Sequence, residues 1–218
     1  GEATPVDVEV LTLGLSEVNA FAGLDGGTDA AMGFALAGGE LAIALIGEVA
    51  DPAQRYFTLQ GTAESAGLVG FDPDTVDGDL DVMYVNINLA AVNGKVIDYA
   101  ARALTIATGG ASDWTFDFAG VDGEELRVGG QMNLDIAGFA RVTGSLYMEK
   151  KTAELSVYES SANTLVDVDL LTIGGSDIEA FIGVGLGTAE AKGFAVEDLD
   201  FALVMAREQS GSHRDWLT

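Results

Sequence analysis

The chain of 218 residues has no cysteine, a single histidine, three prolines and only ten basic residues. The lack of cysteine excludes disulfides, cysteine-ligated zinc and a cysteine nucleophile. The ten Lys and Arg residues stand against 35 Asp and Glu residues, a formal net charge of −25, and so acidic a chain is not expected to bind nucleic acid. The densest apolar run, residues 41–46, is far shorter than the roughly 20 residues of a spanning helix, so no membrane span is predicted.

The chain nevertheless has enough apolar residues for a folded core. Hydrophobic residues make up 48% of it, which argues against a disordered acidic tail. A folded, acidic, cysteine-free chain is consistent with an extracellular or cell-surface location without disulfides. The first residue is Gly1 rather than methionine, so we expect the chain to be processed or to be a piece of a longer one.

An internal repeat is the strongest signal in the sequence. Residues 6–46 match residues 166–206 at a constant offset of 160, without a gap, and 17 of the 41 aligned pairs are identical. A match of this length that also preserves the hydrophobic phase is not expected by chance.

The repeat predicts the domain organisation. One complete repeat of about 160 residues covers 6–165, and a second, truncated copy begins at 166 and runs to 218. In that second copy Arg214–Trp216 is predicted to correspond to Arg55–Phe57, after the loss of one loop residue. The chain is therefore expected to be a segment of a much longer tandem array.

Alternation of apolar and polar residues indicates β-strands throughout. It is clear over residues 6–10, 166–170 and 83–89, and glycine-containing turns separate such stretches. The predicted fold is all-β, an elongated antiparallel β-sandwich or a β-solenoid-like tandem repeat, with the sheet continuous between copies. We assign Val96–Thr108 to a strand, although its alanines also allow a helix. Residues 152–169 are expected to form strand, short turn and strand across the repeat boundary.

A glycine-phenylalanine pair beside a short turn precedes several predicted strands. We interpret these phenylalanines as core anchors beside tight turns, and the alternative is an exposed aromatic platform for a ligand. The residues predicted to be structural are Phe21, Gly33, Phe34, Gly70, Phe71, Gly138 and Phe139.

The densest carboxylate cluster is a candidate calcium site, formed by Asp72, Asp74, Asp77, Asp79 and Asp81. Calcium takes about six to eight oxygen ligands, and loops that alternate aspartate with small residues supply them. The spacing departs from that of an EF-hand loop, because one extra residue is inserted and no glutamate closes the loop. The alternative is an acidic turn leading into a strand over 80–89. Calcium is the one cofactor that the sequence suggests.

No catalytic motif is found. His213 shares one loop with Ser212 and Asp215, whereas the members of a catalytic triad converge from separate elements. The sequence has no nucleophile elbow, P-loop, zinc-protease motif or dinucleotide fingerprint. Aromatic residues are candidates for a sugar-binding surface, but in alternating strands most aromatics pack in the core or across strands; they are Trp114, Trp216, Tyr56, Tyr84, Tyr99, Tyr147 and Tyr158.

Several motifs follow one another in a characteristic order: VDVxxLTxGxSxxxAFxG, RYFTLQGTA, SAGLVGFD, VDGDLDVMYVNIN and LDIAGFARVTGSLYMEK. This order resembles the repeats of giant bacterial surface proteins, which often carry an LEPR-XLL motif near the N-terminus and sometimes RTX-type calcium-binding segments. The most specific parts are residues 65–71 and 137–145. The resemblance implies export, a structural or adhesive role and no catalysis. It transfers no binding residues, because the motif positions here are glycines and apolar residues.

The sequence therefore predicts a non-enzymatic structural repeat module of a very large exported bacterial protein. It would serve as a stiff spacer or a fibre-forming unit in cell-surface adhesion or an extracellular filament. Its predicted partners are neighbouring copies of the same repeat, within one chain or self-assembled. The alternative hypothesis is a calcium-dependent module of a secreted adhesin that binds a ligand or carbohydrate. A third hypothesis, an acidic hydrolase, requires carboxylates that converge in a cleft.

Overall fold

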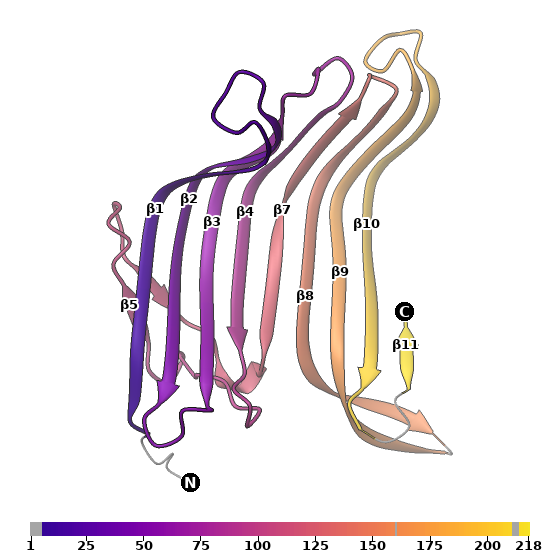
Figure 1. Ribbon diagram of the computed structural model, residues 1–218. Coiled ribbons are helices and arrows are strands. Elements are labelled where there is room, and N and C mark those ends of the chain that lie inside the picture. The colour runs from indigo at the N-terminus through magenta and orange to yellow at the C-terminus, as the bar shows by residue number, and fades with distance from the viewer. Residues whose placement is uncertain (1–5, 160, 211–213) are drawn as a thin grey trace.

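The dominant feature of the computed structural model, which describes residues 6–159, 161–210 and 214–218, is one large antiparallel sheet (Figure 1). Its nine strands lie in the order β1-β2-β3-β4-β7-β8-β9-β10-β11. Apart from β4 and β7, neighbours in the sheet are also neighbours in the chain, so the sheet is a meander. No α-helix occurs in the residues just listed. The prediction of an all-β fold with a large antiparallel sheet is confirmed.

Most strands of this sheet are long, and the 17 residues of β1 span about 56 Å at the usual rise per residue. The bounds of the nine strands are β1 Val8–Leu24, β2 Met32–Glu48, β3 Arg55–Val69, β4 Asp77–Leu89, β7 Glu125–Ile136, β8 Ala140–Glu159, β9 Ala162–Val184, β10 Lys192–Glu208 and β11 Asp215–Leu217.

The connection between β4 and β7 forms a small separate hairpin. Its strands are β5 (Leu104–Ile106) and β6 (Trp114–Phe116), and a 3-10 turn, η1 (Gly120–Asp122), follows them. The prediction of a strand over Val96–Thr108 is wrong for most of that segment. The reason is local: the backbone groups of residues 97, 99 and 100 bond to the Asn88 side chain and to the carbonyl of Phe118 instead of to a strand.

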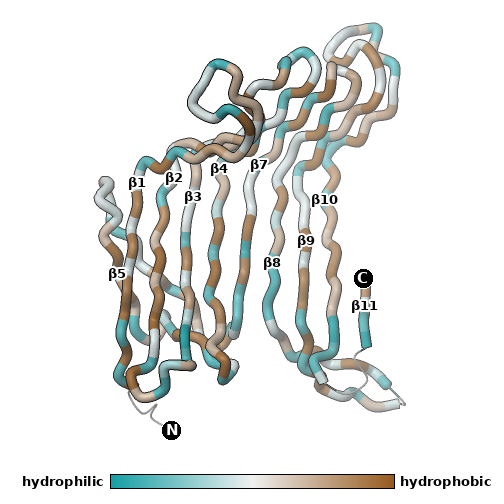
Figure 2. The backbone as a smooth tube through the Cα atoms, viewed as in Figure 1, coloured by the Kyte–Doolittle hydropathy of each residue, from teal (hydrophilic) through white to brown (hydrophobic). Residues whose placement is uncertain are grey.

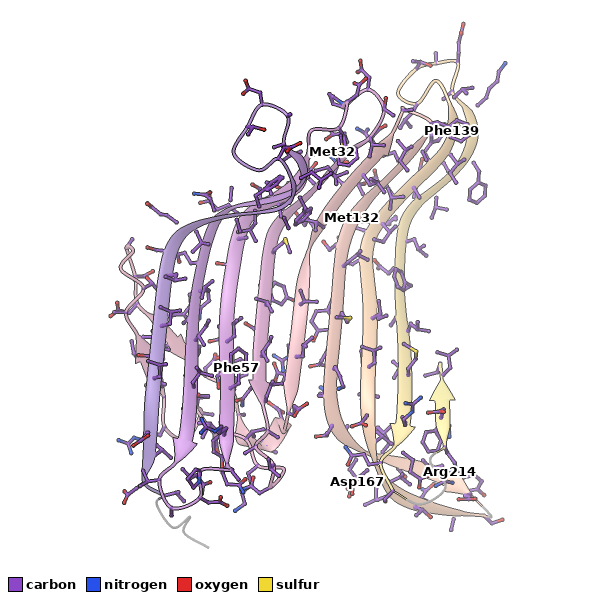
Figure 3. All side chains as sticks on the ribbon, in the orientation of Figure 1. Met32, Phe57, Met132, Phe139, Asp167 and Arg214 are labelled. Carbon is purple, nitrogen blue, oxygen red and sulfur yellow. The ribbon has the colours of Figure 1, made fainter. Side chains whose placement is uncertain are left out.

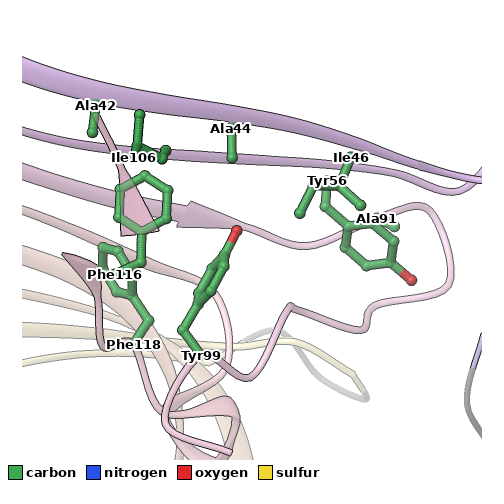
Figure 4. Packing of buried hydrophobic residues seen from close by; sticks show 9 residues of the cluster. All are labelled: Ala42, Ala44, Ile46, Tyr56, Ala91, Tyr99, Ile106, Phe116 and Phe118. Carbon is green, nitrogen blue, oxygen red and sulfur yellow. The ribbon is translucent and has the colours of Figure 1, made fainter. Parts of the chain in front are cut away.

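The hairpin packs on one face of the sheet and forms the main hydrophobic core (Figure 4). Rings from the connection approach β2 closely because β2 presents only alanine methyls there, from Ala42 and Ala44. The Tyr99 and Phe116 rings meet edge to face with their centroids 5.1 Å apart. The Tyr99 hydroxyl lies 2.8 Å from the Thr58 hydroxyl on β3, so the polar end of this buried ring is hydrogen-bonded.

The sheet bends sharply near one end of its strands (Figure 1). At this level the register shifts between β1 and β2, between β4 and β7, between β8 and β9, and between β9 and β10. Such β-bulges kink a strand and increase its twist. Positive φ angles mark the bulged residues Glu17 (54°), Gly38 (63°), Gly144 (141°), Asp177 (51°) and Asp198 (55°). We therefore attribute the bend of the sheet to these bulges, which lie at one level in several of its strands.

The strand pattern across residue 165 agrees with the sequence prediction. Strand β8 ends at Glu159, β9 begins at Ala162, and β9 continues through Leu165 and Val166 without interruption. The segment over 152–169 is thus strand, short turn and strand, as predicted. The sheet is continuous from residue 8 to β11, with no separate second layer of long strands in the described part of the chain.

Candidate functional site: an open sheet edge and two unlike faces

The hairpin β1–β2 and the hairpin β9–β10 have the same register. Val10 pairs with Ile46 in the first, and Leu170 pairs with Ala206 in the second, and both residues of the second pair are 160 positions further along the chain. The turns agree as well. The amide of Thr28 donates to the Asp25 carbonyl at 3.2 Å, and 160 residues later the amide of Thr188 donates to the Gly185 carbonyl at 3.0 Å.

One substituted pair shows compensation between the two hairpins. Leu15 lies opposite Leu41 in the first, whereas Gly175 lies opposite Phe201 in the second. A Cβ on Gly175 would clash with the Phe201 ring. The smaller residue on one strand therefore makes room for the larger one on its neighbour.

The start of a third strand follows the same pattern, with one correction to the sequence prediction. Tyr56 pairs with Ile46, and Trp216 pairs with Ala206. The 160-residue offset thus persists into β11, and Asp215, not Arg214, corresponds to Arg55. The predicted loss of one loop residue is wrong, because the pairing of β11 with β10 keeps the same offset as the pairing of β3 with β2.

The two hairpins differ in their outer neighbour. Strand β9 pairs along its outer edge with β8, whereas no strand in the described chain pairs with the outer edge of β1. Val166 and Val168 are 8% and 0% exposed, while their counterparts Val6 and Val8 are 53% and 40% exposed. The difference arises because Val166 and Val168 pack with apolar side chains of β8, namely Ala153, Leu155 and Val157.

The face of the sheet opposite the small hairpin is apolar and open. Figure 2 shows hydrophobic residues alternating along the long strands, and Figure 3 shows their side chains. Most of these side chains are half-buried or exposed. One row of side chains crosses all nine strands, about 40 Å at the usual strand spacing, and its only charged member is Lys150. The row consists of Leu13, Ile43, Leu59, Ile87, Leu126, Lys150, Leu171, Met205 and Leu217. Exposed apolar surfaces of this extent are typical of interaction sites.

The hairpin-side face carries a charged network on β7 and β8 that sequence reasoning missed. The Arg127 Nε lies 2.8 Å from Glu125 Oε1 and 2.9 Å from Glu149 Oε1, and Lys151 Nζ lies 3.0 Å from Glu149 Oε2. Burial raises the pKa of Glu125. Burial would raise the pKa of Glu149 too, but hydrogen bonds and charges from Lys151 and Arg127 outweigh it and lower that pKa. The alternation Glu-x-Arg in β7 and Glu-x-Lys in β8 is the signal that could have found this network.

Beside the network, tyrosines alternate with glycines across the strands. Tyr84, Gly129, Tyr147 and Gly174 lie in one row on β4, β7, β8 and β9. Burial and the charge of Glu149 raise the pKa of Tyr147 to about 12. An open groove of about 460 Å³ lies here, and its lining includes both tyrosines and Phe201 but no charged side chain. The groove can offer ring surfaces and hydroxyls, but it contains no acid and base pair for hydrolysis.

The five aspartates of the candidate calcium site do not converge. Asp72 forms a turn in which its Oδ1 accepts the Asp74 amide at 3.0 Å, while Asp77, Asp79 and Asp81 lie at every second position of β4. Alternate residues of a strand are about 6.7 Å apart, too far for one ion to bind all three. No group of three or more acidic or histidine side chains is arranged for a metal ion within the part of the chain that the structure describes. Calcium binding stays a prediction, and this arrangement does not support it.

A smaller polar groove of about 380 Å³ lies next to that strand. Asp81 from β4 shares its lining with Asp177 and Glu179 from β9. The Asp177 amide donates to Asp200 Oδ1 at 3.0 Å, so part of this acidic surface serves to hold the bulge between β9 and β10.

The phenylalanines of the glycine-phenylalanine motifs are not core residues, so that prediction is wrong. Phe34, Phe71 and Phe139 of these motifs, and Phe21, which follows an alanine, are 37–52% exposed. They lie in or near the turns beyond the bend, where nothing in the described chain covers the sheet; Figure 3 labels Phe139 there. They do not form one platform either. Phe21 pairs with Ala35 and Phe34 with Ala22, and adjacent registers place the two rings on opposite faces.

The partner glycines nevertheless have a structural role. A Cβ on Gly33 would clash with the backbone of Ala22, and one on Gly70, which has a φ of 80°, would clash with that of Ala31. Gly138 has a φ of 61° in the turn between β7 and β8. These positions therefore require glycine for close strand approach or for tight turns.

The aromatic residues considered for sugar binding are dispersed. Tyr56 and Tyr99 are buried, and the Trp114 indole donates to Gln60 Oε1 at 3.2 Å. The guanidinium of Arg214 lies 5.3 Å from the centre of the Trp216 ring. His213 lies outside the described residues.

No family model, no curated protein and no solved structure matches the chain. The resemblance to giant bacterial surface proteins therefore stays a prediction. In the described residues no helix has the length and apolar character needed to cross a membrane.

Proposed function

We propose that the chain is a non-enzymatic repeat module of a very large exported bacterial protein, in which successive copies add strands to one continuous sheet. The observation that carries this proposal is the β9–β10 hairpin. It repeats the sequence and register of β1–β2, and β8 joins it to the preceding strands within the same sheet. The strands between the two hairpin copies all belong to this sheet, so the copies are parts of one folded unit rather than separate domains joined by a linker.

The geometry gives the dimensions of such an array. Each copy contributes six strands, β1 to β4, β7 and β8, so an array lengthens by about 29 Å per repeat at the usual strand spacing. The array axis runs across the strands, along the hydrogen bonds of the sheet. A continuous ladder resists bending within the sheet, which is the property that a stiff spacer or a filament needs.

The charge distribution supports an extracellular role. Acidic residues gather at turns and strand ends, such as Asp25, Asp51, Asp72 and Asp135, and every further copy adds negative charge. Like-charged edges and turns disfavour lateral aggregation of β-proteins. The open apolar face remains available for contact with another surface of the same assembly.

The proposal is tested by detecting the native protein in its source cells with an antibody raised against this chain. The expected result is a species of hundreds of kilodaltons that is labelled on intact cells. A native species near 22.5 kDa that is found only inside the cell would contradict the proposal.

A further inference from the structure

We infer that the outer edge of β1 is a binding site for a strand with the sequence of β8, contributed by another copy of this repeat. The inference rests on the proposed function for the source of that strand, but its evidence is the pairing of β8 with β9. Because β9 repeats β1 in sequence and in its register with β10, the strand that completes β9 is the model for the strand that completes β1.

Subtracting the 160-residue offset from the β8–β9 register gives the register of the proposed pair. Lys151 lies opposite Leu170 and Ala153 opposite Val168, so the incoming strand would place Lys151 opposite Val10 and Ala153 opposite Val8. Leu155 would lie opposite Val6. Alternate residues of β1 would use their free N–H and C=O groups to bond this strand, as edge strands do.

The side chains of β1 already suit such a partner. Val6, Val8 and Val10 are all exposed, although valine alternating with acid is the pattern of a strand buried on one face. Two of their counterparts at β9, Val166 and Val168, are buried against apolar residues of β8, and the third, Leu170, is partly buried in the same cluster with Ala206 and Trp216. The exposed valines of β1 therefore mark a contact that is complete in the second hairpin and missing in the first.

The charge of β8 also favours this pairing. The strand contains three basic and three acidic residues, so it is neutral, whereas the whole chain carries a net charge of −25. A neutral strand approaches the acidic chain without the repulsion that most other segments of the protein would meet.

A second copy of this chain cannot supply the whole of β8 through its own free edges. Residues 140–151 of its β8 are paired on both sides, with β7 and β9, and only residues 152–159 have a free edge. Its other open edge belongs to β10 and β11, which correspond to β2 and β3 and are not β8-type strands. The occupant is therefore a β8-type strand that precedes β1 in an array or is added in trans.

The test uses the intact chain and a synthetic peptide of residues 140–159, with amide hydrogen exchange as the readout. At saturating peptide, exchange over Val8–Leu15 is expected to slow by at least about tenfold, while the already paired Val168–Gly175 is unchanged. A matched control peptide with Leu155→Lys and Val157→Lys keeps the backbone but loses the apolar contacts, and its affinity should fall by about tenfold or more.

Two outcomes would overturn the inference: no slowing at β1, or equal affinity of both peptides. A chain variant with Val8→Lys separates edge pairing from non-specific adsorption on the apolar face, because it should lose peptide binding while a Leu45→Lys variant retains it. The peptide results do not depend on the size or location of the native protein. A small intracellular native protein would refute the proposed function and leave the edge inference standing. Failure of the peptide to bind at β1 would refute the edge inference and leave the test of the proposed function unaffected.

Discussion

Val8 and Val168 are the same residue at the same place in two hairpins, and they form a matched pair for mutation. Val168 is completely buried, whereas Val8 is 40% exposed. We predict that Val168→Ala destabilises the protein substantially and that Val8→Ala has only a small effect. The comparison isolates the contribution of β8, because the flanking sequence and the register with the next strand are alike.

The magnitude follows from the two methyl groups that each mutation removes. At Val168 the lost burial and the cavity together cost about 2–3 kcal/mol. At Val8 the partly exposed methyl groups contribute about 1 kcal/mol or less. The lower β-propensity of alanine affects both variants alike, so it cancels in the difference, which we expect to be about 1.5 kcal/mol.

Urea unfolding followed by circular dichroism, together with hydrogen exchange over β9, measures both variants. Exchange is needed because the end of a long sheet can open locally without global unfolding. Trp216 fluorescence provides a local probe, since this ring packs in the same cluster as Val168. Equal destabilisation by the two substitutions would refute the reasoning, because it would mean that β8 does not bury Val168 in solution.

Three further predictions concern the core, the charged network and calcium. Phe116→Ala should cost about 3–5 kcal/mol in urea unfolding, since Phe116 is fully buried between hairpin and sheet, while Val121→Ala, at a 91% exposed site, should cost almost nothing. Because the pKa of Glu149 is lowered in the folded state, its ionised form stabilises the fold at neutral pH. This contribution disappears as the pH falls below about 4.3, the ordinary pKa of glutamate, and through the lower folded-state pKa. The difference in melting temperature between wild type and Glu149→Gln should therefore narrow between pH 6 and pH 3, and a constant difference contradicts a stabilising role of the Glu149 charge. Calcium should raise the melting temperature no more than magnesium at equal ionic strength, because the acids of residues 72–81 do not converge; a calcium-specific rise would restore the calcium hypothesis.

Much of the fold could be predicted from the sequence because strands with one wet face have a two-residue period. The alternation of valine with acid over 6–10 and 166–170 locates β1 and β9, and the offset of 160 predicts their equal registers. Local signals of this kind survive in any fold, since they depend only on which side of a strand faces the solvent.

The number of layers could not be predicted, because alternation does not say what covers a face. Leu13 and Ile43 look like core residues in the sequence, yet nothing in the described chain covers them. The prediction that the phenylalanines are core residues is wrong for the same reason. Phe34 and Phe139 are large and apolar, and only the structure shows that both are partly exposed, one near the start of β2 and the other in the turn after β7.

The charged network was missed because it depends on pairing between strands. Arg127 meets Glu149 through the register of β7 with β8, which a single sequence does not fix. The calcium candidate failed to converge for a related reason: Asp77, Asp79 and Asp81 lie in an extended strand, and a strand separates alternate carboxylates that a loop could have gathered.

The most direct test of the account is hydrogen exchange on an extended chain in which residues 6–165 precede residues 6–218. The account predicts that β1 of the second copy exchanges as slowly as Val168–Gly175 does in the single chain, because β8 of the first copy now pairs with it. The β1 strand of the first copy should stay fast and serves as the internal control. Equally fast exchange in both copies of β1 would contradict the claim that successive repeats build one continuous sheet.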